Sequence, residues 1–454
     1  MGSKQEKNRI TRRTFLKTSS AAVGIATSAP LIGSLGFPSK SQAAETVRVF
    51  MFGHTYPRGF KKYFPEFKKK TGMSVQLETP SFPIYNQRAD LELSGATGAY
   101  DVMTMTFIYT GKWMGAGWST NLIPFLEDPK LTNKAEFDPD DFLAGAMAPL
   151  KMEGAIYALP FVAESTLMVY RTDILEKFGY SKPPDTFDEL MEMAAKIHTK
   201  QCAAYVGRGQ PHSFHWVFPN FLQAYGGNFF ADPPKDMTPT LDTEEAIQAA
   251  DIFVRLHRDY AVPGVVNFME DDSRIAMQQG RGAMWIDALA WVGTAGDRKN
   301  STVADKVAYA LPPKGPKGRF PQVAVHGLQI PAAAKRKKIS WEFIKWALSK
   351  EMMARISKEF AYPAVTRASV LDSPEYKKKY NWGGSDIGAL HKEVLKLAGS
   401  GYMAYRTVPV FPPVGDRVGI ALIEACTGQK SVRQAMQDCN RDVAAILKKA
   451  GYKI

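Results

Sequence analysis

The chain has 454 residues, of which 45% are hydrophobic and 23% charged, and its formal net charge is +13. Residues 1–43 account for +6 of that charge, and no run of Lys and Arg in the chain exceeds the four residues 335–338. Because no such run is interleaved with aromatic residues along a helix, the composition gives little support to nucleic-acid binding. Some 410 residues after position 43 are too many for one hydrophobic core and predict two domains.

Residues 1–43 have the order of a secretory signal. The pair Arg12-Arg13 precedes Phe15-Leu16, an uncharged stretch covers 18–39, and Ser41-Gln42-Ala43 supplies the small residues that a signal peptidase needs. The arginine pair indicates the twin-arginine (Tat) type of signal. We expect cleavage near Ala43 and a periplasmic location, with retention of the segment as a membrane anchor as the alternative.

The mature chain is predicted to begin with a buried strand over 47–53 that ends in a glycine turn. A helix follows, which Gly72 closes and which Pro65 should kink or shift at its start. Its apolar face consists of Phe60, Tyr63, Phe64 and Phe67.

Two further strands are predicted over 75–78 and 100–105, with a helix through 88–93 between them. This β-α-β-α-β order predicts a parallel sheet with helices on its faces.

Three later helices are predicted from their start signals. Thr186 and Glu189 form a capping box after Pro183-Pro184. Asp242 with Glu245, and Ser431 with Gln434, are interpreted in the same way.

Three cysteines in an oxidising compartment are too few for a disulfide framework. No cysteine precedes Cys202, so none near the signal could carry a lipid. Cys426 and Cys439 could pair, but Cys439 lies on an apolar stripe with helical spacing, which favours a buried free thiol. The other members of that stripe are Val432, Ala435, Met436, Val443, Ile446 and Leu447.

An ordered series of short segments covers nearly all of the mature chain. It consists of 67–75, 154–160, 167–171, 184–190, Gly226-Gly227, 279–284, 311–313 and 341–351. Taken in order, these segments resemble the family 1 extracellular solute-binding proteins, a group that includes maltose-binding and other sugar-binding proteins.

The resemblance implies an α/β fold of the two-lobe periplasmic binding protein type, with a parallel-rich sheet in each lobe, a hinge and an interlobe cleft. It places the first lobe at 44–161 plus 312–363 and the second at 164–306 plus 366–454. The chain would cross between lobes near 160–164, 306–313 and 362–365. A ligand in the cleft would close the lobes, and the permease of an ABC importer would recognise the closed form.

Sugar recognition requires aromatic faces for the C–H side of the ring and polar groups for the hydroxyls. Such groups converge in loops after the carboxyl ends of parallel strands. We therefore expect the ligand-binding residues to be His54, Tyr56, Thr106, Phe107, Glu164, Phe214, Trp216, Trp285, Asp287, Trp291, His326 and Asp416.

The individual assignments have different grounds. Glu164 matches the family's first crossing, where a glutamate reaches the sugar, although a bond to backbone amides is the alternative. Trp216, followed by Phe214, stands where relatives supply a stacking aromatic residue, and Trp285 with Asp287 would share one strand face. Trp291 could instead belong to the core, and Asp416, which precedes a predicted helix, could be its cap.

The sequence contains no acidic residue near Thr106, where maltose-binding relatives tend to carry one, and this disfavours a maltodextrin. A neutral sugar or polyol is therefore the expected ligand. The three carboxylates of Glu164, Asp287 and Asp416 leave a cationic ligand such as a polyamine as an alternative. A further alternative is a sensor subunit that reports the ligand to a membrane receptor.

Motifs of nucleotide-binding, redox, metalloprotease or serine-hydrolase enzymes do not occur, so no enzymatic activity and no cofactor are expected. The His212-x-x-His215 spacing permits a metal, but no Cys, Asp or Glu accompanies it in the loop, and no metal is expected. The predicted partners are the small ligand, the ABC permease and the Tat machinery, with a monomeric protein and no nucleic acid.

Overall fold

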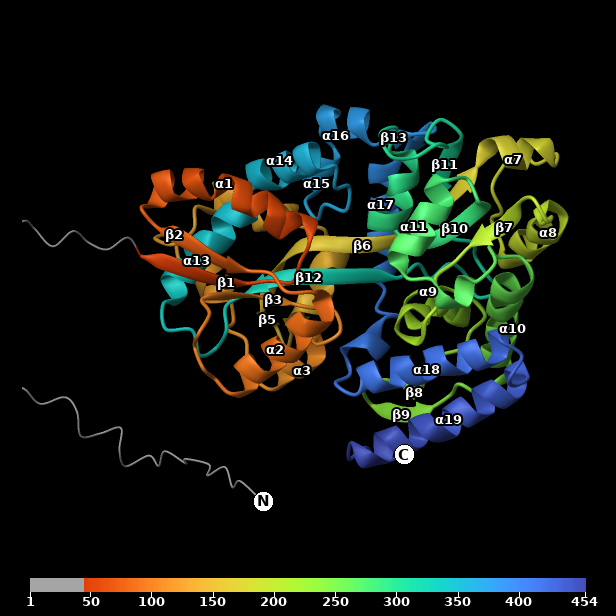
Figure 1. The fold of residues 1–454 in the computed structure, drawn as a ribbon. Coiled ribbons are helices and arrows are strands. Elements are labelled where there is room, and N and C mark those ends of the chain that lie inside the picture. The colour runs from red at the N-terminus through yellow and green to blue at the C-terminus, as the bar shows by residue number, and fades with distance from the viewer. Residues whose placement is uncertain (1–44) are drawn as a thin grey trace, which may run out of the picture. The chain divides into compact units, whose positions relative to one another are not determined.

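A mixed β-sheet of eight strands runs through residues 45–454, which the computed structural model describes (Figure 1). Its strands are β1 (Thr46–Phe50), β2 (Ser74–Glu78), β3 (Val102–Met105), β6 (Ala158–Arg171), β7 (Ala203–Val206), β10 (Gly282–Ala288), β11 (Val307–Ala310) and β12 (Val323–Gln329). Their order is β2-β1-β3-β12-β6-β10-β7, with β11 also paired to β6.

The predicted β-α-β-α-β order over residues 47–105 is confirmed. Strand β1 pairs in parallel with both β2 and β3, and the helices between them are α1 (Thr55–Thr71) and α2 (Phe82–Ser94). Gly72 ends α1 in a left-handed conformation with φ of 74°, as its position after the apolar stripe predicts. Pro65 lies inside α1, which begins at Thr55, before Phe60, the first residue of the predicted apolar face.

Strand β6 links the two parts of the sheet. Its first half pairs antiparallel with β12, and its second half pairs antiparallel with β10 and β11. We call the part built on β1, β2 and β3 the first lobe and the part built on β7, β10 and β11 the second lobe. The antiparallel pairings of β6 and β12 make the sheet mixed, although β1, β2 and β3 are parallel.

Helices cover both lobes. In chain order the remaining ones are α3 (Thr110–Gly115), α4 (Ile123–Glu127), α5 (Lys134–Phe137), α6 (Ala144–Met147), α7 (Thr172–Lys177), α8 (Phe187–Ile197), α9 (Pro211–Ala224), α10 (Glu244–Asp259), α11 (Glu270–Gln278), α12 (Leu289–Val292), α13 (Lys337–Ala347), α14 (Lys350–Phe360), α15 (Ala368–Leu371), α16 (Pro374–Lys379), α17 (Ile387–Ala398), α18 (Phe411–Cys426) and α19 (Val432–Lys449). Figure 1 shows α1 and α14 on one side of the first lobe's sheet and α2 and α3 on the other.

Short elements complete the fold. They are the hairpin strands β4 (Lys151–Met152) with β5 (Ala155–Ile156), β8 (Phe230–Asp232) with β9 (Asp236–Pro239), and β13 (Asn381–Trp382) with β14 (Ser385–Asp386). The short 3₁₀ helices are η1 (Pro139–Asp141), η2 (Ala148–Leu150), η3 (Val265–Asn267), η4 (Gly293–Gly296) and η5 (Ala404–Thr407). Of these, η5 contributes to the candidate site.

Two of the three predicted helix starts are confirmed. Thr186 and Glu189 form the capping box of α8, and the Ser431 hydroxyl accepts a hydrogen bond from the Gln434 amide at the start of α19. The prediction for Asp242 is wrong, because Thr243 is the N-cap of α10 and its hydroxyl accepts from the Ala246 amide. The N-cap side chain accepts from the amide two or three residues later, and Thr243 stands three residues before the Ala246 amide.

All three cysteines lie within the described residues and are free. Cys439 is completely buried in α19, as its apolar stripe predicts, and burial raises the pKa of its thiol to about 12. Between residues 45 and 454, no helix has both the length and the apolar character needed to cross a bilayer. The predicted signal over 1–43 lies outside the described residues.

Candidate ligand-binding site

Five of the predicted residues form one group where the two lobes face each other. Nε2 of His54 lies 3.9 Å from Oε1 of Glu164. The ring of Phe107 lies 5.4 Å from that of His326 and 5.8 Å from that of Trp216, measured between centroids. Because these side chains come from the start of α1, from β6, from β12, from α9 and from the loop after β3, the fold alone brings them together. We call this group, together with Arg406, the interlobe cluster.

His54 is held at the N-cap of α1. Its Nδ1 accepts a hydrogen bond from the Tyr56 amide at 3.3 Å, and its Nε2 lies 3.2 Å from the Tyr362 hydroxyl. An Nδ1 that accepts leaves the proton of the neutral ring on Nε2. His54 therefore caps the start of α1, and the same ring also faces Glu164.

Glu164 is a half-satisfied buried carboxylate. Its Oε2 accepts a hydrogen bond from the Ala290 amide at 3.1 Å, whereas Oε1 has no hydrogen-bond partner. The side chain lies in β6, within the segment predicted to cross between lobes. One oxygen thus makes the backbone contact that the sequence left open as an alternative, and the other remains available as an acceptor.

Trp216 contributes an aromatic face and a donor. Its ring is buried in α9, and its Nε1 has no hydrogen-bond partner. Buried Trp N–H groups usually find an acceptor. Trp216 therefore retains a free donor in the interlobe cluster.

Arg406 is the residue of this cluster that sequence reasoning missed. It lies in η5 and is only 4% exposed. Its guanidinium carbon is 4.6 Å from the ring centroid of Trp216 and 5.3 Å from that of Phe107. Its Nε donates to the Tyr405 hydroxyl at 2.8 Å, whereas Nη1 and Nη2 have no partner. The concentration of aromatic residues around Arg406, with Tyr402 and Tyr405 before it, was the available signal.

His326 lies within β12 and is enclosed by aromatic rings. Phe52 and Phe107 approach it with centroids at 4.7 and 5.4 Å. Burial, together with the nearby His54, lowers the pKa of His326 well below its usual value, so the ring is neutral near pH 7. Its Nδ1 also has no hydrogen-bond partner.

Two other predicted residues lie beside the cluster. Thr106 is buried, and its hydroxyl donates to Oδ1 of Asn86 at 2.8 Å. Tyr56 is buried between Phe161 and Tyr362, and its hydroxyl has no partner. Thr106 therefore already has a protein partner, whereas Tyr56 retains an unused polar atom.

The structure assigns different surroundings to four predicted residues in the second lobe. Phe214 is completely buried against Phe253, which makes it a core residue. Trp285 is also completely buried. Trp291 is half-buried in α12. Asp416 is exposed and lies inside α18, whose first turn is occupied by Pro412-Pro413, so it is not a cap.

Asp287 is part of a closed ion-pair network. Its Oδ2 accepts from Nε of Arg208 at 2.6 Å, and its Oδ1 accepts from Nη2 of the same residue and from the Ala288 amide. Nη1 of Arg208 donates to Glu270 at 2.6 Å. Burial opposes the charge on Arg208, but the two carboxylates outweigh it and raise the pKa of Arg208. Asp287 and Trp285 lie two residues apart in β10, as predicted, but both carboxylate oxygens of Asp287 already accept hydrogen bonds within the protein.

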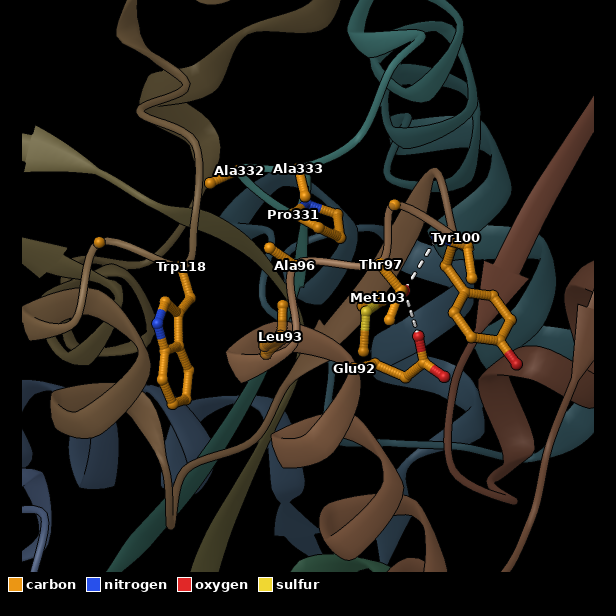
Figure 2. A pocket seen from close by; sticks show the side chains of 13 residues that line it. Glu92, Leu93, Ala96, Thr97, Tyr100, Met103, Trp118, Pro331, Ala332 and Ala333 are labelled. Carbon is orange, nitrogen blue, oxygen red and sulfur yellow. Dashed lines mark hydrogen bonds between the residues drawn. The ribbon is translucent and has the colours of Figure 1, made fainter.

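A separate small cavity of ≈150 Å³ lies at the end of α2, and Figure 2 shows its lining. Leu93, Trp118 and Pro331 contribute apolar surface there, and Glu92 accepts a hydrogen bond from Thr97 at its edge. Its lining contains none of the predicted residues and no buried polar atom without a partner. We therefore place the candidate site at the interlobe cluster.

The interlobe cluster can bind a polar ligand by hydrogen bonds. Its unpartnered atoms comprise an acceptor on Glu164, donors on Trp216 and Arg406, and Nδ1 of His326. Within residues 45–454, no group of three or more His, Cys, Asp or Glu side chains is arranged to hold a metal ion.

Comparisons with known proteins identify the family of this chain. A family model described as bacterial extracellular solute-binding protein matches residues 53–354. A mannitol-binding protein of Pseudomonas aeruginosa is 25% identical over 447 residues, with 92% of this chain and 97% of that protein covered. An ABC transporter solute-binding protein of Agrobacterium vitis S4, solved with bound D-mannitol, superposes with a TM-score of 0.75 and 26% identity, over 90% of this chain and 100% of that one.

A solute-binding protein of Agrobacterium radiobacter K84, solved in complex with ribitol, superposes with a TM-score of 0.76 at 23% identity, over 88% of this chain and 98% of that one. These structures have the two-lobe fold that the sequence implied, and the family model covers more than half of this chain. The chain belongs to the bacterial extracellular solute-binding protein family, and it is a solute-binding protein rather than an enzyme.

Proposed function

We propose that the protein binds an acyclic polyol or a closely related sugar at the interlobe cluster and delivers it to an ABC importer. The observation that carries this proposal is the presence of unpartnered donors and an unpartnered acceptor in one buried place. Glu164 offers an acceptor, and Trp216 and Arg406 offer donors. Leaving such groups buried without partners costs about 1–3 kcal/mol each, and more for charged groups.

Hydroxyl groups match this set because each one both donates and accepts hydrogen bonds. An ammonium ligand could satisfy Glu164 but would leave Arg406 and Trp216 without acceptors. A carboxylate ligand could satisfy Arg406 but would leave Glu164 without a donor. A chain of neighbouring hydroxyls serves all three residues, and the rings of Phe107 and Trp216 can cover its C–H surface.

The similar proteins support the narrower ligand class. The relative from Pseudomonas aeruginosa binds mannitol, and the two similar structures hold D-mannitol and ribitol. All three ligands are acyclic polyols. We therefore place this class ahead of ring sugars.

A polyamine, which the sequence left as an alternative, is not favoured by the site. Asp287 is neutralised by Arg208. The guanidinium of Arg406 places a positive charge over the rings of Trp216 and Phe107, where a cationic ligand would be repelled.

The test is a thermal-shift and calorimetric screen of the protein from residue 44 onward against D-mannitol, ribitol, glucose, a sugar acid and spermidine. A polyol at 100 times its dissociation constant should add about 2.7 kcal/mol to the free energy of unfolding. Glucose should give a smaller shift and spermidine none. A shift with spermidine alone, or with no polyol, would contradict the proposal.

We also infer that residues 1–43 direct Tat export and are removed near Ala43, which leaves a monomeric periplasmic protein. The support is the order of Arg12-Arg13, uncharged stretch and small-residue site. Replacing both arginines with lysine should keep the protein in the cytoplasm, as measured by cell fractionation, and mass spectrometry of the exported protein should find a start near Ala44. Light scattering should give the mass of one chain.

The predicted lobe boundaries form part of the same proposal. The first crossing, near 160–164, falls inside β6, which pairs with strands of both lobes. We infer that this continuous strand acts as part of the hinge. Deuterium exchange should show ligand-dependent protection on both sides of β6 rather than within one lobe alone.

A further inference from the structure

Helix α3 of the first lobe and η5 meet at an unusually close backbone contact. A Cβ built on Gly111 would overlap the carbonyl oxygen of Thr407 and would lie 2.5 Å from its carbonyl carbon. Real Cβ atoms essentially never approach so closely, and the obstacle is backbone, which a side-chain rotation cannot remove. The contact therefore requires a residue without a side chain at position 111.

The glycine is not explained by its own backbone conformation. Gly111 is not among the residues with positive φ, and it lies in the first turns of a helix. At such a position glycine is roughly 1 kcal/mol less favourable than alanine. The missing Cβ, rather than conformational freedom, is the property that the contact with Thr407 uses.

The two sides of the contact belong to different lobes. Helix α3 is tied to the first lobe by the hydrogen bond from Nε1 of Trp113 to Asp90 in α2, at 3.0 Å. The segment that contains η5 is tied to the second lobe, because Nε2 of Gln223 in α9 donates to the Tyr402 carbonyl at 2.6 Å. The ring of Tyr405 also stacks on Phe229 at 4.6 Å.

Thr407 directly follows Arg406, so the position of one backbone sets the position of the other. With Thr407 against Gly111, the guanidinium of Arg406 lies over Phe107 of the first lobe and Trp216 of the second. Its two Nη atoms are then buried with no protein partner. The close contact and the free donors are two consequences of the same approach of η5 to α3.

We propose that Gly111 is a positioning residue for ligand binding. Because Gly111 has no Cβ, Thr407 can contact α3 when the lobes close, and this contact positions the guanidinium of Arg406 at the ligand. The inference rests on the proposed function, because the ligand supplies the acceptors that Arg406 lacks. A side chain at position 111 would hold η5 away from α3 and keep the guanidinium out of reach of the ligand.

Gly115 provides a matched control for the test. It lies in the same helix, it does not have a positive φ, and a Cβ built on it meets no atom within 4 Å. Gly111→Ala and Gly115→Ala therefore add the same methyl group and the same helix propensity, and they differ in the contact with Thr407. The probes are D-mannitol and ribitol, titrated by calorimetry, with urea unfolding of each ligand-free variant and X-ray scattering with and without the polyol.

Gly111→Ala should weaken polyol binding roughly 10-fold or more, should reduce the ligand-induced decrease in radius of gyration, and should unfold without ligand at the same urea concentration as Gly115→Ala. In an Arg406→Gln background, Gly111→Ala should add little further loss, because both changes remove the same interaction. Gly115→Ala should bind like the wild type.

Three results would overturn the inference. Gly111→Ala could bind the polyols as tightly as Gly115→Ala, its loss could add fully to that of Arg406→Gln, or it could destabilise the ligand-free protein as strongly as it weakens binding. If the wild-type protein bound neither polyol, the proposed ligand class would fail and the inference would fall with it. Wild-type binding thus separates failure of the proposed function from failure of the role of Gly111.

Discussion

Two buried arginines in this protein have opposite surroundings. Arg208, in the second lobe, directs Nε and Nη2 at Asp287 and Nη1 at Glu270. Arg406 is buried to a similar degree, but only its Nε has a partner, the Tyr405 hydroxyl. Burial is therefore the same at the two places, and the supply of hydrogen-bond partners is what differs.

This difference distinguishes a buried charge that stabilises the fold from a buried charge that is available to bind a ligand. A buried charge with a complete set of partners stabilises one arrangement of the fold, and removal of one partner is costly because the other is left alone. A buried charge with an incomplete set of partners destabilises the free protein, and this cost is compensated when a ligand supplies the missing partners. Arg208 belongs to the first kind, and Arg406 with Glu164 belongs to the second.

Removal of Arg208 should have the largest effect. Arg208→Gln leaves Asp287 buried without a counter-charge and should lower the free energy of unfolding by about 3–5 kcal/mol. Urea unfolding of the ligand-free protein measures this. Arg258→Gln is the control, because the Arg258 pair with Asp259 is largely exposed and should be worth less than about 1 kcal/mol. Equal losses in the two variants would contradict the distinction.

Acid should destabilise the protein through a different buried group whose hydrogen bonds are satisfied, the imidazole of His391. Nδ1 of His391 lies 2.8 Å from the Ser165 hydroxyl and Nε2 lies 2.9 Å from the Val365 carbonyl, and burial lowers the pKa of His391 from 6.5 to about 4. In the unfolded chain the His391 imidazole is protonated below about pH 6.5, whereas in the folded chain it is protonated only below about pH 4. Stability should therefore fall by roughly 3 kcal/mol from this group as pH drops from 6.5 to 4, and this group should add no further change at lower pH.

The measurement is urea unfolding at several pH values between 7.5 and 4. His257 has its pKa lowered to about 4 by burial as well and should contribute in the same direction. His391→Gln should be less stable at pH 7.5 but should lose less stability on acidification than the wild type. An unchanged pH dependence in that variant would show that His391 titrates normally in the folded protein.

Substitution of Arg406 should affect binding rather than folding. Arg406→Gln removes charged donors, each worth about 1.5–3 kcal/mol, so polyol affinity should fall roughly 10- to 100-fold. The free energy of unfolding without ligand should stay the same or rise, because an incompletely paired charge has been removed. Calorimetry and urea unfolding give the two quantities. A large loss of ligand-free stability would show that Arg406 stabilises the fold as Arg208 does, which would contradict the distinction between the two arginines.

The smallest expected effect is that of a single neutral donor. Trp216→Phe keeps an aromatic face but removes the unpartnered Nε1. Loss of one neutral hydrogen bond to the ligand should cost about 0.5–1.5 kcal/mol, which is roughly 2- to 10-fold in affinity. Phe214→Leu, in the core beside Phe253, is the contrasting variant and should alter stability more than affinity. If Phe214→Leu lowered the affinity and Trp216→Phe lowered only the stability, the ligand would contact Phe214 rather than Trp216.

Local features of this protein could be predicted from the sequence because their causes lie within a few residues. The strand β1, the glycine that ends α1 and the caps at Thr186 and Ser431 depend on short-range periodicity and on side chains three residues from an amide. The same reasoning placed the cap of α10 one residue too early and put Asp416 before a helix that in fact begins at Phe411. Such errors arise because neighbouring residues compete for the same role.

The family and the two-lobe fold also followed from the sequence, since an ordered series of segments carries that information. His54 and Phe107 were predicted because they follow strand ends, and Glu164, His326 and Trp216 were predicted with them. The structure brings these five residues into one group. Their roles as ligand contacts stay a prediction.

What only the tertiary structure decided is which polar groups already have partners. Asp287 meets Arg208 from 79 residues away, and Gly111 meets Thr407 across the two lobes. Sequence alone shows that Asp287 and Arg406 are both charged, but not that one is paired and the other is not. Hydrogen-bond satisfaction is a non-local property, because donors and acceptors are matched in space after the chain has folded.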